Sequence, residues 1–431
     1  MAAQPLQTAA ARWPTDTVTR LEVVLLLAMR SFVPLCLALA VPAQTFIVDA
    51  ASGPGTNFTD LPSAIAAVPD GAILLVRPGN YGPIALDGKG LSILATAPGV
   101  QLAPGGTSIL VQNLSASQAF TLRGVRAQLG SVFVVALVQN CAGPVLFDGY
   151  QFTSNQTFSA IFCIGLRVQG STQVVLRNCT IQAHLALDAQ SSAIAAEQCE
   201  LRGHDAFFVP HVGSYPGSGI QCQSSSIELS RCRVFGGAGV MMSTPLGPAI
   251  TDPGPAVLLY SLSSARLSED ASSIYQAGQL VGGGAVAAVE GNQSSVVRTP
   301  QAVLLGSQGG AAVAAILSDT IRPLPSLRTI GAPPGGTMTV DVTTPPGELV
   351  ILGFSTPMPP IAVPGFDGAL WLDPASLVLV TAGVPQPAQP LTATVAVPPI
   401  ASLVGQRFGW QAAAWSAAEG FRFGNPSIFA L

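Results

Sequence analysis

Charged residues are scarce in this 431-residue chain. Only 9% of it is Asp, Glu, Lys or Arg, against about a quarter of an ordinary soluble domain, and the formal net charge is −4. Lys89 is the only lysine, and the arginines are dispersed with no basic cluster interleaved with aromatic residues. Nucleic acid is therefore excluded as an expected partner.

Long apolar runs and aromatic residues are also lacking. The chain is 49% hydrophobic, yet no apolar run is long enough to span a bilayer, and aromatics make up 6%. Gly (45) and Pro (36) are abundant instead. A chain of this kind stays soluble most easily as stacked β-sheet with small aliphatic side chains inside and Gly, Ser, Asn and Pro in the turns. The excess of Ala, Gly, Pro and Arg is typical of a GC-rich bacterial genome.

The N-terminus resembles an export signal. Residues 29–31 give a short positive start, residues 32–41 form an apolar core, and Ala43 precedes Gln44 as a small residue at a cleavage point. We interpret 1–43 as a leader, with the signal peptide at about 29–43 and Met29 as the true start. This predicts a secreted or cell-surface protein with no membrane span once the leader is removed.

A degenerate repeat runs through the middle of the chain. Each copy is a short apolar strand, a polar or glycine step, and a second strand that ends in a polar pair, as in Ala136–Cys141 followed by Val145–Gly149. No copy has helical periodicity, and the strands are rich in Val, Ile, Leu and Phe. The pattern predicts an all-β fold: a right-handed parallel β-helix of three-strand coils over residues 44–320, each coil pairing with the next.

The cysteines set the register of the coils. Six follow the leader: Cys141, Cys163, Cys179, Cys199, Cys222 and Cys232. Aligning the third, fourth and sixth gives steps of 20 and 33 residues, which fits a short coil with loops inserted at its turns. Export makes disulfides available to these cysteines. A column of buried free thiols is the favoured interpretation, although neighbouring coils lie within disulfide reach.

The same alignment makes a prediction about charge. It places Arg177 over Glu197 and Glu200 over Arg233 on neighbouring coils. Opposite charges directly across a strand pair stabilise a sheet.

An open end of such a coil needs a cover, and residues 58–71 predict one. Thr59 or Asp60 can cap a short helix that has Pro62 in its first turn, and the sequence Pro-Asp-Gly at 69–71 ends it. The helix would present Leu61, Ala64, Ile65 and Val68 to the coil, and the first strand is expected at 72–76.

The pattern changes after residue 320. The segment 321–325 is interpreted as a stiff proline-containing linker, and 326–431 as a small antiparallel β-sandwich. Strands are expected at 337–342, 349–354, 377–380, 391–397, 408–415, 421–423 and 428–431. Trp371, Trp410 and Trp415 are interpreted as core anchors rather than as a sugar-stacking platform.

Two regions of the chain resemble known proteins. Residues 58–71, running into 75–81, resemble the first coil of the pectin lyase-like superfamily, which includes pectin methylesterases and many bacterial β-helix proteins. The segments 369–375, 402–405 and 421–425 are similar to a domain appended to secreted bacterial proteins. The resemblance implies the β-helix fold and polysaccharide chemistry.

The catalytic motifs of that superfamily are missing, however. We find neither the two aspartate settings and Gly-Arg-Pro-Trp segment of a methylesterase nor the clustered aspartates of a pectate lyase. Of the Gly-His-Gly motif of a polygalacturonase only Gly203-His204 is present. Because no phosphate loop, Ser/His/Asp elbow or Cys-x-x-Cys pair occurs either, the sequence predicts no cofactor and no metal site.

The most site-like feature is a cluster of titratable residues. Its members are His184, Glu200, His204, Asp205 and His211, which include all three histidines. Such residue types supply general acids and bases or metal ligands. Their spacing matches no ligand motif, and a solvated loop is the default interpretation.

Two functions follow. The first is an exported, non-catalytic β-helix that binds extracellular polysaccharide or a cell-envelope component, or serves as a surface or structural module. The alternative is a divergent polysaccharide lyase, esterase or glycoside hydrolase that acts through residues 184–211. Convergence of the cluster on one groove with two carboxylates would favour the enzyme.

Overall fold

A computed structural model describes residues 43–431 except for 105, 129–132, 155–162, 207–215, 245–246, 269–272, 280–284, 331–334, 387–388 and 401–402. The predicted leader therefore lies outside the described residues, apart from Ala43, and so does His211.

Three parallel sheets form the first part of the described chain. Sheet A contains β1 (Thr45–Val48), β2 (Ile73–Val76), β5 (Leu91–Ala95), β8 (Phe120–Arg123), β11 (Val145–Asp148), β14 (Val174–Arg177), β17 (Ala193–Glu197), β20 (Ser226–Ser230), β25 (Ser264–Ser268), β28 (Ser295–Arg298) and β31 (Ser318–Ile321). Sheet B contains β3 (Gly79–Tyr81), β6 (Val100–Leu102), β9 (Val125–Ala127), β12 (Gln151–Thr153), β15 (Thr180–Ala183), β18 (Glu200–Gly203), β21 (Arg233–Phe235), β26 (Ile274–Gln276) and β29 (Val303–Leu305). Sheet C contains β4 (Ile84–Asp87), β7 (Ile109–Gln112), β10 (Val134–Gln139), β13 (Ile164–Gln169), β16 (Leu185–Gln190), β19 (Ile220–Gln223), β24 (Val257–Tyr260), β27 (Val289–Gly291) and β30 (Val313–Ala314).

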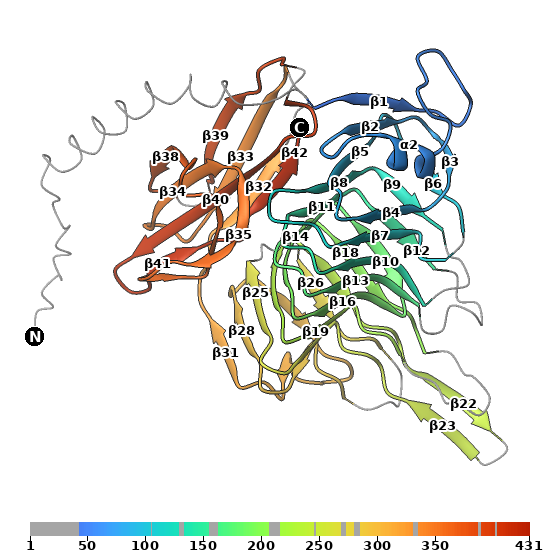
Figure 1. The fold of residues 1–431 in the computed structure, drawn as a ribbon. Helices are drawn as coiled ribbons and strands as arrows, with labels where there is room; N and C mark the ends of the chain where they lie inside the picture. The colour runs from blue at the N-terminus through green and yellow to red at the C-terminus, as the bar shows by residue number, and fades with distance from the viewer. Residues whose placement is uncertain are drawn as a thin grey trace, which may run out of the picture. The chain divides into compact units, whose positions relative to one another are not determined.

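The chain visits the sheets in the order A, B, C and then returns to sheet A one coil further on. Each strand pairs in parallel with the strand one coil before it and the strand one coil after it, as β14 does with β11 and β17. In Figure 1 the colour changes steadily along this stack, from blue beside α2 to orange at β31. This is the right-handed parallel β-helix that the repeat predicted.

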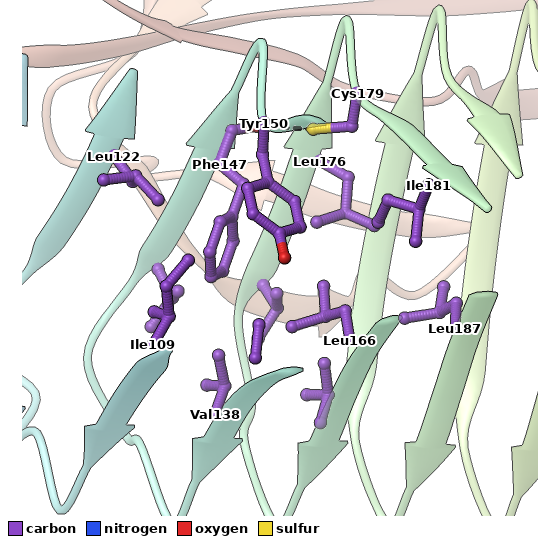
Figure 2. Close-up of a cluster of buried hydrophobic side chains, with 14 of the residues drawn as sticks. Ile109, Leu122, Val138, Phe147, Tyr150, Leu166, Leu176, Cys179, Ile181 and Leu187 are labelled. Atoms are coloured by element: carbon purple, nitrogen blue, oxygen red, sulfur yellow. Dashed lines mark hydrogen bonds between the residues drawn. The ribbon is translucent and has the colours of Figure 1, made fainter. Parts of the chain in front are cut away.

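Side chains from all three sheets fill the interior of the coil. Figure 2 shows Leu122 and Phe147 from sheet A, Ile181 from sheet B and Leu166 from sheet C pointing into one core. The Phe147 ring packs edge-on against Phe120 at 5.9 Å between centroids. Each of these side chains is fully buried, and burying one of this size contributes about 1.5–3 kcal/mol. Each coil adds only a few such side chains, but these pack on the side chains of the neighbouring coils. The core is therefore continuous along the stack.

The predicted register is confirmed. Arg177 pairs with Glu197, with 3.5 Å between Nε and Oε2. Glu200 pairs with Arg233, with 3.2 Å between Oε2 and Nη1. Opposite charges therefore occupy neighbouring coils at both predicted places.

The cysteines are buried free thiols in the structure, as favoured from the sequence. Three of them, Cys179, Cys199 and Cys232, each follow a residue with positive φ at the corner between sheets A and B. That left-handed residue turns the chain sharply, so that the next side chain points inward. Burial, and then the neighbouring thiols on either side, raise the pKa of Cys199.

The corner between sheets B and C varies in length from coil to coil. Between β15 and β16 it is a single residue, His184. Between β21 and β24 it contains a hairpin of β22 (Val240–Thr244) and β23 (Gly247–Thr251), which pair antiparallel. Insertions into the coil are therefore made at this corner.

The N-terminal end of the coil has the predicted helical cover. The helix α2 (Leu61–Ala67) has a proline in its first turn and buries Leu61, Ala64 and Ile65. Asp60 is its N-cap residue, but the carboxylate accepts a hydrogen bond from Gly82 N–H at 2.8 Å instead of capping the helix. The expected first strand is β2; β1 precedes it and was not predicted.

Charged residues occupy inward positions at the other end of the coil. Arg298 continues the inward column of Leu267, and Asp319 continues that of Val296. They form a two-pronged ion pair, with 2.9 Å between Arg298 Nη2 and Asp319 Oδ2. Inward-pointing charge makes a sheet end a poor template for pairing with another chain.

A β-sandwich follows β31. One sheet contains β32 (Ser326–Ile330), β33 (Thr337–Thr343) and β39 (Leu391–Ala396). A second contains β34 (Leu349–Ser355), β36 (Phe366–Asp367), β38 (Val378–Gly383), β40 (Arg407–Ser416), β41 (Gly420–Phe423) and β42 (Ser427–Ala430), and β35 (Pro357–Ala362) pairs with β37 (Ala369–Leu372). All described pairings here are antiparallel except that of β36 with β41. We call residues 326–431 the C-terminal sandwich.

The C-terminal sandwich packs on the outer face of sheet A. The outward side chains of Leu146, Val175 and Ala195 contact Trp371 and Ile428. Trp371 and Trp410 are buried, as expected of core anchors, while Trp415 is half-buried. Trp371 thus anchors the sandwich to the coil rather than filling the centre of the sandwich.

Candidate functional site

The outer face of sheet C carries one glutamine per coil on five successive coils. These residues, Gln112, Gln139, Gln169, Gln190 and Gln223, are in register, and we call them the glutamine column. The next position in the column is Tyr260, whose side chain is 39% exposed. Coils in parallel register are about 4.8 Å apart, so the column presents amides at regular intervals.

The glutamine column faces outward because the strands of sheet C alternate. The residue before each glutamine is buried in the core, as Val138, Val168 and Cys222 are. Amide Nε2 of Gln169 donates to Oε1 of Gln190 at 2.9 Å, so part of the column is hydrogen-bonded along its length.

The charged residues beside the glutamine column are one ion pair and two further carboxylates, Asp87, which precedes Gln112 in the column, and Glu290. Arg167 Nε lies 2.7 Å from Asp188 Oδ2, and the same carboxylate oxygen accepts from Gln190 Nε2 at 3.0 Å. Glu290 is on the same face, and Arg167 is the only cation on a described outward position of sheet C. This face therefore offers neutral hydrogen-bonding groups and no surplus positive charge.

Serines line the corner between sheets C and A, next to the glutamine column. Ser171, Ser192, Ser225 and Ser263 are buried and stack on successive coils. Each hydroxyl oxygen accepts a backbone N–H from the previous coil at 3.1–3.2 Å, the donors being Cys141, Ser171, Ser192 and Ser225. We call this the serine ladder. Its hydroxyls also donate to carbonyls of their own turn, so they are fully used by the fold.

A second set of hydroxyls lies outside the serine ladder. Ser191 and Ser224 have positive φ, at 49° and 51°, and are exposed. Their hydroxyls, and that of Ser226, make no hydrogen bond to any residue that the structure describes. Each is therefore open to donate and to accept one.

Ser191, Ser224 and Ser226 line a groove of about 520 Å³. It runs along four coils, past Ser171, Ser191, Ser224 and Leu262, and its far side is formed by Pro359 and Pro360 of β35. We call it the serine groove. Because β35 belongs to the C-terminal sandwich, the groove exists only where the sandwich packs on the coil.

Buried charge accompanies that packing. Ser427 Oγ donates to Glu197 Oε2 at 2.6 Å, and Arg177 Nη2 donates to the Thr329 carbonyl at 3.1 Å. Burial raises the pKa of Glu197, while Arg177 and Ser427 oppose the rise.

Glu228 in β20 lies on the same outer face of sheet A. Burial raises the pKa of this carboxyl to about 7, against the influence of Arg266. The Trp371 indole also favours the charged form, but its N–H makes no hydrogen bond of ordinary geometry to a described residue. A carboxyl in this position holds its proton close to neutral pH.

The structure brings together two of the histidines predicted from the sequence. His184 and His204 lie on successive coils at the corner between sheets B and C, and His204 Nε2 is hydrogen-bonded to Ser154 Oγ. Burial lowers the pKa of both; the nearby His204 adds to the effect on His184, whose pKa falls to about 4. His204 is only 5% exposed and Ser154 only 3%. This corner holds neutral imidazoles within the fold.

The carboxylates of the predicted cluster are not paired with each other. Glu200 at the start of β18 bonds to Arg233 and lies 3.6 Å from Arg202. Asp205, beyond the end of β18, accepts the Ala238 N–H at 2.8 Å. About 13 Å of extended chain separates Glu200 from His204. Over the residues that the structure describes, no group of three His, Cys, Asp or Glu could hold a metal ion.

Comparisons with known proteins give distant structural similarities. No known family matches the sequence, and no curated protein matches it. Among solved structures, the chain is similar to a pectin methylesterase in complex with hexasaccharide VII, at 9% identity and a TM-score of 0.27, over 70% of this chain and 85% of that one. It is also similar to tailspike protein 2 from Escherichia coli O157:H7 bacteriophage CAB120, at 10% identity and a TM-score of 0.25, over 84% of this chain and 64% of that one. In the described part of the chain, no helix has the length and apolar character needed to cross a membrane.

Sequence reasoning missed both the glutamine column and the serine groove. A signal for the first was present, because Gln190-Ser191-Ser192 and Gln223-Ser224-Ser225 recur at the ends of equivalent strands. No sequence signal connects Pro359 and Pro360 with those serines, since their contact depends on how the sandwich packs.

Proposed function

We propose that this protein is an exported, non-catalytic β-helix that binds an extracellular polysaccharide along sheet C. The observation that supports this most directly is the glutamine column, which repeats a neutral donor and acceptor once per coil beside an exposed tyrosine. An uncharged polysaccharide is itself a periodic array of hydroxyls, and amides and hydroxyls can both donate to and accept from it. The leader-like segment at 29–43 supports export.

Binding to a panel of immobilised polysaccharides tests this function. We expect the full chain to be retained by at least one of them, with no release of reducing ends or unsaturated uronates. Gln223→Ala should weaken that binding about two- to twelvefold, because one hydrogen bond contributes about 0.5–1.5 kcal/mol. Gln151→Ala is the matched control, since Gln151 is an exposed glutamine on the outer face of sheet B. Equal effects of the two variants, or no binding at all, would reject the proposal.

A second function is favoured by one specific contact. The hydrogen bond between Ser154 and His204 has the composition of a nucleophile and its base, as in an esterase. Both side chains are buried, which leaves the hydroxyl closed to a substrate in this conformation. Ester or polysaccharide turnover that disappears in both Ser154→Ala and His204→Ala, with folding retained, would establish the enzyme in place of the binding protein.

A further inference from the structure

The serine groove is built from two parts of the chain that are far apart in sequence. We propose that it is a binding subsite for an uncharged glycan, with β35 of the C-terminal sandwich as one wall. This inference rests on the proposed function and adds to it a ligand class and a place.

The dimensions of the groove suit a segment of an extended chain. Its volume of about 520 Å³ lies within the range of roughly 300–1,000 Å³ that is usual for ligand sites. Its long direction crosses four coils, from Ser171 to Leu262, and three steps between coils amount to about 14 Å. The groove thus runs parallel to the glutamine column and beside it, so that one polymer can contact both.

The hydroxyls at the groove divide into two sets with different roles. The serine ladder forms the floor, and its hydrogen bonds to successive coils fix it in place. Ser191, Ser224 and Ser226 stand above the floor with hydroxyls that no described residue uses. Since the coil fixes the backbone of these residues, a ligand has only their short side chains to order on binding.

Charge decides the class of ligand. None of the residues that line the groove is charged. Recognition of carboxylates or sulfates ordinarily requires Arg or Lys, and the nearest cation on sheet C, Arg167, is paired with Asp188. The outward carboxylate of Glu290 adds negative potential to this face. An acidic polysaccharide would therefore be repelled where a neutral one is not.

Apolar groups complete the lining. The Pro359 and Pro360 rings form the far wall, Leu262 is 76% exposed at one end, and Tyr260 lies beside it. A sugar ring has C–H faces as well as hydroxyl edges, so a wall of rings facing a row of hydroxyls matches both. The wall is tied to the coil at its two ends, because β35 pairs with β37 on either side of the two prolines, at Pro357 and at Ile361, and Trp371 of β37 is buried against the coil.

Filling the groove provides the test. Thr172 is exposed and lines the groove, and Thr172→Trp would occupy it. Thr180→Trp is the matched control, because Thr180 is exposed on the outer face of sheet B. The probes are neutral polysaccharides (dextran, mannan, galactan and xyloglucan) and acidic ones (polygalacturonate and alginate), each titrated against the full chain. A double variant, Pro359→Ala with Pro360→Ala, tests the wall without adding bulk, and thermal melting checks that each variant folds.

We expect a neutral polysaccharide to bind more tightly than either acidic one. Thr172→Trp should weaken that binding at least tenfold, the proline double variant should weaken it several-fold, and Thr180→Trp should leave it unchanged. Tighter binding of an acidic polysaccharide, or no effect of either groove variant, would overturn the inference about the groove. The proposed function would still stand in that case if Gln223→Ala weakened binding. Failure of every polysaccharide to bind would overturn both.

Discussion

The buried carboxyl of Glu228 makes the stability of this fold depend on pH in a predictable direction. Its pKa is raised from 4.5 to about 7 in the folded chain because burial disfavours the charged form. Between these two values the folded state retains a proton that the unfolded chain releases. The free energy of unfolding must then decrease as pH rises through that window. The contribution is fully present below pH 4.5 and lost above about pH 7.

A shift of this size amounts to about 3 kcal/mol, at about 1.4 kcal/mol per pKa unit. Glu228→Gln keeps the shape and the neutral state but cannot ionise. We expect the variant and the wild type to be similarly stable at pH 4.5, and the variant to be more stable by about 3 kcal/mol at pH 8. Urea unfolding followed by tryptophan fluorescence measures the difference, because Trp371 lies against the same carboxyl.

Glu200→Gln supplies the control. Glu200 is a half-exposed carboxylate in a surface ion pair with Arg233, and such pairs contribute at most about 1 kcal/mol. If Glu228→Gln followed the wild type at every pH, or lost stability relative to it as pH rose, the reasoning about burial on sheet A would be wrong.

Three further predictions concern other parts of the chain. Phe147→Ala should lower the free energy of unfolding by about 3–5 kcal/mol, measured in urea, because it empties a fully buried ring position beside Phe120. Replacing both Arg298 and Asp319 with Leu should cause concentration-dependent self-association in analytical ultracentrifugation, since it removes inward charge at a sheet end; a monomer at all concentrations would contradict this. The pKa of His184 is lowered to about 4, so its contribution to stability is present above pH 6.5 and is lost as pH falls. His184→Asn should therefore reduce the fall in melting temperature between pH 6.5 and 4.5. An unchanged fall would count against this explanation.

The fold could be predicted from the sequence because the repeat is a local pattern. Aligning three cysteines was enough to place Arg177 over Glu197, since every parallel coil is in register with the next. The strand β1 was missed because its four residues, Thr45–Val48, precede the first recognisable copy of the repeat and are separated from β2 by the covering helix.

The candidate site was less accessible for a related reason. His184 and His204 were identified because they are close in sequence, and they do lie on adjacent coils; Glu200 is just as close in sequence but faces outward to Arg233. The packing of the sandwich had a weak signal, because Leu146 and Val175 are apolar at outward positions. The sequence did not indicate which residues of the sandwich would contact Leu146 and Val175, since that depends on tertiary contacts alone.

At the corner between sheets B and C, the chain can be longer or shorter while the core of the coil keeps its packing. A coil closes there with His184 alone, and another accommodates a whole hairpin, while the strands on either side keep the same register. New segments can therefore be gained at this corner by small genetic insertions without repacking the interior. It is also where an engineer would graft a foreign loop, in place of the hairpin of β22 and β23.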